Sequence, residues 1–325
     1  IDVVVSPKNF NVQYAASWSK DRKAWDFIGS GATSGIYKSE DAGLTWKLFT
    51  TAESGFPVGE GVGRIGLAVY DDATVYAVLD NQFKRPLESK KSNSLPIAFS
   101  VPGDEFLKIP NKSLNSILKN YGLTEKFRAE NIKHWIQNGY LQPNEAAKVV
   151  LEAINSLAEK EVIGAEVYKS SNGGKNWTKT HPGFIDDFFY SYGYYFSVLS
   201  VDPNDVNKIY LSGVPIIKSN DGGITFTSIS EDNVHADHHV VWVNPNKSGH
   251  LINGNDGGLN ISYDDGAHWF KGNSHGVSQF YAVNVDEQEP YNIYGGMQDN
   301  GVWVGPSNYN YSSEWYQTGK YPYEN

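Results

Sequence analysis

Four copies of one eight-residue pattern run through this chain, and they constrain its fold more than any other feature. The pattern is Ser-x-Asp-x-Gly-x-Thr-Trp, and its copies begin at Ser39, Ser170, Ser219 and Ser262. The Asp side chain, or Asn172 in the second copy, can accept backbone N–H groups of its own turn. The Gly can supply a positive φ, and the final Trp or Phe opens the next strand as an apolar anchor. The pattern therefore predicts one hairpin turn that is used repeatedly within a repeated unit.

We expect the residues that define these turns to be structural. They are Ser39, Asp41, Gly43 and Trp46; Ser170, Asn172, Gly174 and Trp177; Ser219, Asp221, Gly223 and Phe226; and Ser262, Asp264, Gly266 and Trp269. Strand-like segments between the turns group in fours, which predicts an all-β fold of about five four-stranded units. The copies at 170, 219 and 262 are 49 and 43 residues apart, whereas 131 residues separate those at 39 and 170. One unit of about 45 residues leaves an insertion of roughly 85 residues in the second unit.

The insertion is also visible as a change of period, because strand signals stop near residue 84 and return near 163. Leu114, Ile117 and Leu118 repeat at helical spacing, Thr124 is a candidate cap, and Pro143 can open a further helix. We expect residues 84–162 to form a three-helix subdomain between the second and third strands, with residues 1–83 and 163–325 forming the repeated β units. The insertion is interpreted either as a packing cap or as a lid or partner-docking element.

Composition excludes several classes of function. The chain has 325 residues, with 27 basic and 37 acidic side chains and a formal net charge of −10. Nucleic acid is therefore not an expected partner, because such binding depends on clustered Lys and Arg. Cysteine is absent, which excludes disulfides and thiol chemistry. No apolar run is long enough for a membrane helix, and no signal peptide is recognised.

The repeated pattern resembles the Asp-box of bacterial-neuraminidase-repeat and sortilin-like β-propellers, in which it joins the third and fourth strands of a blade. Further segments also resemble large bacterial sortilin-like (VPS10-type) repeat proteins that are often labelled glycosyl-hydrolase-like. These are residues 2–18, 22–25, 63–66, 235–239, 254–258 and 295–301. The resemblance implies a β-propeller, a secreted, periplasmic or cell-surface bacterial location, and an interior portion of a larger protein. Further blades or a partner chain are then expected to cover the open ends.

The resemblance also indicates which face carries function. Ligands of propellers commonly bind on the face opposite the Asp-box turns, where the inter-blade loops and the loops between second and third strands lie. We expect a protein, peptide or glycan ligand there, because exposed Tyr and Trp stack on sugar rings or grip peptides. The ligand-binding candidates on these loops are Trp25, Arg64, Tyr190, Tyr192, Tyr194, His235, Asp237, His238, His275 and Gln279.

The strongest local cluster of polar residues is the segment from His235 to His239. If the strand that follows begins early, His235, Asp237 and His239 share one face, as metal ligands would. Imidazole and carboxylate suit zinc, and Asp and Asn oxygens in nearby turns suit calcium. The alternative is that these groups hydrogen-bond neighbouring blades. No other cofactor is expected.

A second hypothesis is enzymatic. Asp256 and Asp299 occupy equivalent loops of adjacent units, and glycoside hydrolysis needs one carboxyl group as acid and another as base or nucleophile. Both residues also sit in good turn sequences, where Asp caps its own backbone. A sialidase is not expected, because it needs three arginines on the substrate carboxylate and the chain has four in total, of which Arg128 lies among the helices of the insertion. The leading prediction is therefore a binding module, and the alternative is a glycoside hydrolase.

Overall fold

The computed structural model describes residues 2–85, 103–120, 123, 125–160, 162–230, 233–272, 278–308 and 316–318. The chain divides into two compact units, Ile1–Lys271 and Gly272–Asn325. Among the described residues, no helix is long and apolar enough to cross a membrane.

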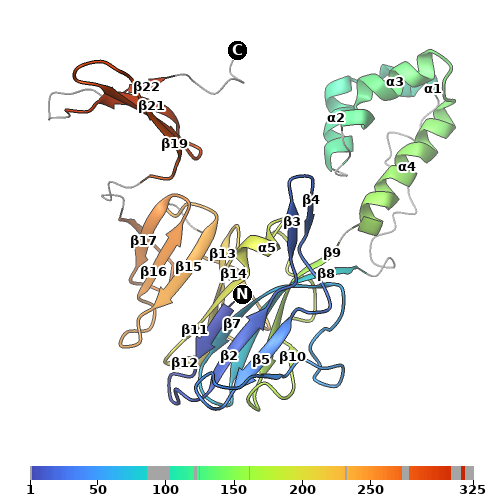
Figure 1. The fold of residues 1–325 in the computed structure, drawn as a ribbon. Helices are drawn as coiled ribbons and strands as arrows, with labels where there is room; N and C mark the ends of the chain where they lie inside the picture. Colours follow the sequence, from blue (N-terminus) through green and yellow to red (C-terminus); the bar gives the residue numbers. More distant parts are fainter. Residues whose placement is uncertain are drawn as a thin grey trace. The chain divides into compact units, whose positions relative to one another are not determined.

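Within these described ranges, five four-stranded antiparallel sheets form the blades, and the strands of each sheet are paired in sequence order (Figure 1). The first two sheets are β1 (Asp2–Val5), β2 (Gln13–Ser17), β5 (Gly35–Ser39) and β6 (Lys47–Leu48), then β7 (Val62–Val69), β8 (Val75–Lys84), β9 (Val162–Ser170) and β10 (Thr178–Lys179). The next two are β11 (Val198–Asp202), β12 (Asp205–Ser212), β13 (Ile216–Ser219) and β14 (Thr227–Ser228), then β15 (His238–Val243), β16 (Leu251–Asn255), β17 (Gly258–Ser262) and β18 (Phe270–Lys271). The second compact unit holds β19 (Phe280–Val285), β20 (Asn292–Met297), β21 (Gly301–Pro306) and β22 (Tyr316–Thr318). The predicted all-β fold of four-stranded propeller blades is confirmed.

The hydrophobic core lies between successive blades, and strand β8 shows why. Its residues Val75 to Asn81 are buried without interruption, because both faces of the second sheet are covered. Val75, Ala77 and Leu79 pack into the cluster shared with the first sheet. The intervening Tyr76 and Val78 pack into the cluster shared with the third sheet. A third cluster, which contains Tyr210, Ile216, Val241 and Leu251, joins the third and fourth sheets in the same way.

The repeated turns have nearly identical geometry in all four copies. In the first, Ser39 Oγ donates to Asp41 Oδ1 at 2.7 Å, and the backbone N–H of Gly43 donates to Ser39 Oγ at 2.8 Å. The side-chain hydroxyl of Thr45 donates to Asp41 Oδ2 and its backbone N–H donates to Asp41 Oδ1, which hold the pKa of Asp41 at about 2. In the second copy, Asn172 Oδ1 accepts the equivalent bonds from Ser170 and from the backbone of Asn176.

The fourth position of each turn ties the turn to the connection between the first and second strands of the same blade. Its backbone N–H donates to the loop between these strands in three copies, from Ala42 to Asn11, from Gly173 to Ala73 and from Asp265 to Gly249. In the third blade, Gly222 donates to Asn207 near the start of β12. All four donors have a positive φ, between 59° and 76°, and the Gly that follows each also has a positive φ. Two successive left-handed residues therefore turn this N–H toward the neighbouring loop, even where the residue is Ala or Asp.

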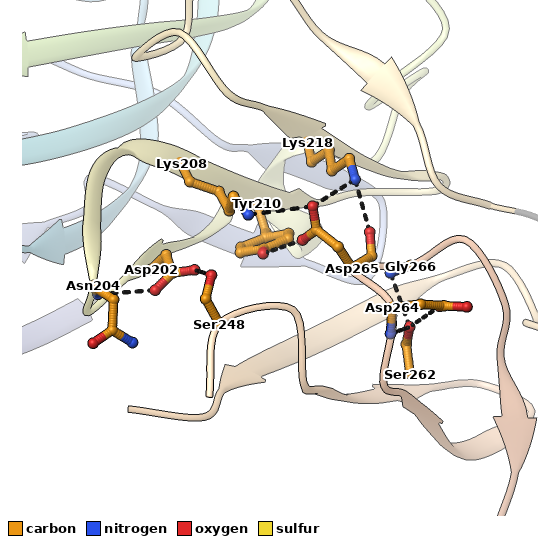
Figure 2. Close-up of polar contacts among 10 residues, drawn as sticks. All are labelled: Asp202, Asn204, Lys208, Tyr210, Lys218, Ser248, Ser262, Asp264, Asp265 and Gly266. Carbon is orange, nitrogen blue, oxygen red and sulfur yellow. Dashed lines mark hydrogen bonds and ion pairs between the residues drawn. The ribbon is translucent and has the colours of Figure 1, made fainter. Parts of the chain in front are cut away.

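Asp265 of the fourth turn also contacts the preceding blade. It accepts hydrogen bonds from the hydroxyl of Tyr210 at 2.6 Å and from Nζ of Lys218 at 2.8 Å, and Nζ of Lys208 lies 3.3 Å away (Figure 2). Burial alone would raise the pKa of Asp265, but the bonds from Lys218 and Tyr210 hold it below its usual value. Asp264, next to it, bonds only within its own turn in this view.

Helices lie between β8 and β9, as predicted, but their number differs from the prediction. Instead of three, the described residues contain four α-helices and a short 3₁₀ helix: α1 (Gly103–Lys108), α2 (Asn111–Asn120), η3 (Glu125–Phe127), α3 (Ala129–Gln137) and α4 (Pro143–Lys160). Pro143 does open α4, and Gly139 follows α3 with a positive φ of 71°. Thr124 lies outside the described residues. The helices bury a cluster of their own, which includes Phe106, Leu114, Ile132 and Val150, so the insertion has its own small core.

Candidate aromatic binding site

A hairpin that the sequence did not predict carries the most exposed Trp of the candidate site. Strands β3 (Asp21–Lys23) and β4 (Asp26–Ile28) leave the first blade between β2 and β5 and lie beside the short helix α5 (Gly193–Phe196) (Figure 1). Trp25 occupies the tip and is 84% exposed. The indole N–H of Trp18 donates to the carbonyl of Gly29 at 2.8 Å, which fixes the base of the hairpin.

The segment that leads into the third blade separates its aromatic residues into two groups. Phe188, Phe189 and Phe196 are buried between the second and third sheets. Tyr190, Tyr192 and Tyr195 are exposed, the last by 53%. The buried Phe side chains anchor the segment, and the tyrosines project from it. The segment therefore combines aromatic residues that pack between the blades with others that face solvent.

Ring contacts join the hairpin, helix α5 and the fourth blade into one aromatic strip. Phe27 of the hairpin lies 6.4 Å from Trp18 and 4.8 Å from Tyr194, measured between ring centroids. Tyr194 is 6.3 Å from Tyr195, and Tyr195 is 5.5 Å from His239. We define the aromatic strip as Trp18, Trp25, Phe27, Tyr192, Tyr194, Tyr195 and His239.

Arg64 supports this strip from beneath. Its Nη1 donates to the backbone carbonyl of Tyr194 at 3.2 Å and to that of Tyr195. Burial lowers the pKa of Arg64, yet an arginine so placed keeps its charge at neutral pH. Arg64 was predicted as a ligand contact, and the structure places its guanidinium on the backbone of α5.

The histidine segment is divided by the start of β15. The strand begins at His238, and the pairing shifts between His238 and Val240, so His239 occupies a bulge. His238 is fully buried with Nδ1 2.8 Å from Asn253 Oδ1, and burial lowers its pKa. His239 Nε2 lies 2.6 Å from Oδ1 of Asp256, a partner that the sequence did not suggest.

The predicted metal ligands do not share a strand face, because His235 and Asp237 precede β15 and His239 lies in the bulge. Within the ranges that the structure describes, no group of three His, Cys, Asp or Glu side chains is arranged to hold a metal ion. Nδ1 of His235 instead lies 3.0 Å from the carbonyl of Ala236, and Asp237 has a φ of 62°. Zinc or calcium binding stays a prediction, which metal analysis of the purified protein checks.

The two predicted catalytic carboxylates lie in different compact units. Asp256 belongs to the first and pairs with His239; Asp299 belongs to the second, where it has a φ of 51° and accepts a bond from Gln298. The backbone carbonyl of Gln279 accepts the N–H of Gln298 at 2.9 Å. His275 lies outside the described residues.

A buried carboxyl group lies directly beneath α5. Asp80 of β8 is 3% exposed, and a Cβ placed on Gly193 would fall 2.2 Å from its Oδ1. Burial raises the pKa of Asp80 to about 6, although a bond from the Gln82 side chain opposes this. The unfolded chain releases this proton near pH 3.8, so the folded protein binds more protons between about pH 4 and pH 6. Stability from this group therefore falls as the pH rises through that interval.

We expect Asp80→Asn to remove this pH dependence. At pH 7 the free energy of unfolding of the variant should exceed that of the wild type by about 2 kcal/mol, and this difference should vanish near pH 4. Urea unfolding at pH 4, 5, 6 and 7 measures both proteins. A constant difference across the four pH values would show that Asp80 does not titrate in this interval.

Comparison with known proteins found structural similarity at low sequence identity. No family model and no curated protein matches it. Among solved structures, it is similar to the GH74 xyloglucanase from Xanthomonas campestris, with 12% identity over 93% of this chain and 35% of that one, at a TM-score of 0.44. It is also similar to YCF48 bound to D1 peptide (8% identity, 98% and 67% coverage, TM-score 0.41) and to the Hadza microbial sialidase Hz136 (14%, 94% and 55%, 0.37). The chain spans about a third of the length of the GH74 enzymes. Identities this low say nothing of activity, substrate or partner.

Proposed function

We propose that this chain is a ligand-binding module that holds a protein segment, a peptide or a glycan along the aromatic strip. The observation that carries the proposal is the unbroken series of ring contacts from Trp18 through Phe27, Tyr194 and Tyr195 to His239. These rings come from three separate parts of the sequence. A chance cluster of surface aromatics would not be held in place by the partly buried guanidinium of Arg64 and a row of buried Phe side chains.

The exposed rings give the strip its binding capacity. Tyr and Trp offer large flat apolar surfaces with a polar edge, which suits both sugar rings and peptide side chains. Contiguous exposed apolar surface on a folded domain commonly marks a binding site. Arg22 and Lys23 beside Trp25 and the His239–Asp256 pair at the other end supply polar groups for orientation.

We also propose that the chain belongs with the bacterial sortilin-like and neuraminidase-repeat propellers and acts outside the cytoplasm. The four repeated turns support this, because the Ser hydroxyl donates to the Asp or Asn side chain in every copy, at 2.7–3.1 Å. Further blades or a partner chain would then cover the exposed sheet faces. Val3 and Leu48 on the first sheet are examples of such exposed apolar residues.

One observation favours glycoside hydrolysis as a second candidate function. Asp256 is part-exposed and lies beside the strip, held by His239. Hydrolysis also needs a second carboxyl group, for which the sequence offers Asp299. Hydrolysis of a glycan that binds the strip, lost in Asp256→Asn and in Asp299→Asn, would support this function; binding without turnover would exclude it for that glycan.

We expect Trp25→Ala and Tyr195→Ala to weaken ligand binding by about tenfold or more each, because truncating a central aromatic contact typically costs about 2 kcal/mol or more. A glycan array and a peptide library identify a ligand for the wild type, and titration then gives the Kd for each variant. Phe10→Ala is the matched control, since Phe10 is also an exposed aromatic residue but lies in the loop between β1 and β2 at the repeated-turn end. Equal affinity in all three variants would place the binding site elsewhere.

A further inference from the structure

A pocket of about 430 Å³ lies at the start of the segment that leads to α5, apart from the aromatic strip. Its walls include Arg85, Gly164, Asp186, Asp187 and Tyr190. The volume falls within the range of small-ligand sites, which is about 300–1,000 Å³. A pocket of this size accommodates one long side chain or a molecule of similar dimensions.

The positive charge in the pocket wall is the guanidinium of Arg85, which already has partners within the protein. Arg85 donates from Nε to the carbonyl of Val162 at 2.9 Å and from Nη2 to that of Ile163 at 3.2 Å. Nη2 also lies 2.6 Å from Oδ1 of Asp186, and the guanidinium stacks 4.1 Å above the ring of Phe184. Arg85 and Asp186 therefore neutralise each other and tie β8 and β9 to the loop.

The wall therefore carries one net negative charge, the carboxylate of Asp187. Its side chain is exposed, and within the part of the chain that the structure describes it forms no hydrogen bond or ion pair. Its φ of 53° and the φ of 51° at Tyr190 are uncommon for residues other than Gly. Tyr190 is 62% exposed and lines the same wall. A carboxylate beside an exposed aromatic ring attracts a cation, through charge and through the π face together.

We propose that this pocket binds a cationic group, namely the guanidinium or ammonium of an Arg or Lys side chain on a peptide. Asp187 provides the counter-charge, and Tyr190 provides the aromatic face. The proposal does not depend on the aromatic strip, so either site can fail in experiment without the other.

Nuclear magnetic resonance titration with N-acetylarginine amide tests the pocket, with uncharged N-acetylcitrulline amide as the matched probe. We expect the arginine probe to bind the wild type with a Kd of about 1 mM, which is ordinary for a single side chain. The citrulline probe should bind at least about tenfold more weakly, because it keeps the shape and loses the charge. Equal binding of the two probes, or no binding of the arginine probe, would overturn the proposal.

Asp187→Asn is the decisive variant, because Asn has the same shape and accepts a positive φ as readily as Asp. We expect it to weaken binding of the arginine probe by about tenfold and to leave the Kd of the strip ligand unchanged. Glu287→Gln removes one carboxylate from an exposed position in the other compact unit and should leave both Kd values unchanged.

Two outcomes would overturn the proposal. If Asp187→Asn and Glu287→Gln weaken binding of the arginine probe equally, the effect is one of net charge and the pocket is not the site. If an anionic probe, N-acetylaspartate amide, binds instead, Arg85 is the anchor and the assignment of a cationic ligand is wrong.

Discussion

Replacing Asp265 by Asn is expected to lower the free energy of unfolding by about 2 kcal/mol, because removing the charge of one partner in a partly buried network leaves the others uncompensated. The carboxylate of Asp265 accepts a hydrogen bond from Tyr210 and forms ion pairs with Lys218 and Lys208, all of the third blade. All three donors are largely shielded from solvent. Asn accepts the positive φ of this position as well as Asp does, so backbone strain adds little. Urea unfolding followed by tryptophan fluorescence measures the change.

Asp264→Asn is the natural control, since the two residues are adjacent in one turn. Asn172 already occupies the position of Asp264 in the second blade and accepts the same bonds. The bond that Asp264 would lose, to Nδ1 of His268, lies on the surface, where ion pairs contribute little. We expect a loss below about 1 kcal/mol. Equal losses in the two variants, or a larger one in Asp264→Asn, would mean that the contact with the third blade does not stabilise the fold.

The contrast between these neighbours shows what the sequence predicted well. The hydrogen bonds of Ser262, Asp264 and Gly266 lie within a few residues, so the residue types alone predicted the turn. Asp265 occupies a variable position of the pattern, and nothing local marks it. Its role depends on a blade that begins more than 60 residues earlier, at Val198. Contacts across such a separation can be identified only once the blades are placed side by side.

The candidate site was predicted in part, for related reasons. Trp25, Tyr192 and Tyr194 were predicted because their side chains suit ligand binding, whereas Tyr195 was not among the candidates. The hairpin of β3 and β4 was missed because its strands have three residues each and are exposed on both faces, so they show no alternation. Helix α5 was missed because its four residues, Gly-Tyr-Tyr-Phe, favour strand by composition. The partnership of His239 with Asp256 depends on a bulge, and a one-residue change of register reverses which face a side chain occupies.

Strand β7 connects the stability of the blades with the proposed binding site. Arg64 holds the carbonyls of Tyr194 and Tyr195, and two residues later Gly66 packs against the backbone of Ser197, which ends α5. The hydroxyl of Ser197 in turn donates to the carbonyl of Gly193 at 2.7 Å. The position of α5, and so of its tyrosines, is fixed by how closely this backbone approaches β7.

Gly66→Ala is therefore expected to reduce stability by about 3 kcal/mol, and to weaken binding at the strip as well. A Cβ on residue 66 would lie 2.2 Å from the carbonyl oxygen of Ser197 and 3.1 Å from Cγ1 of Val78. The first of these is backbone, so relief requires α5 to move away from β7. Urea unfolding gives the loss of stability, and titration with the strip ligand gives the Kd of the folded variant.

Gly296→Ala provides the matched comparison, because Gly296 also lies in a strand and a Cβ there meets no atom within 4 Å. Ala restricts the unfolded chain more than Gly does, so this variant should be neutral or slightly more stable. A Gly66→Ala protein as stable as Gly296→Ala would show that α5 is not packed closely on β7. A protein that loses stability but binds the ligand as tightly as the wild type would separate the packing of α5 from the geometry of the strip, and the tyrosines of α5 would then not be ligand contacts.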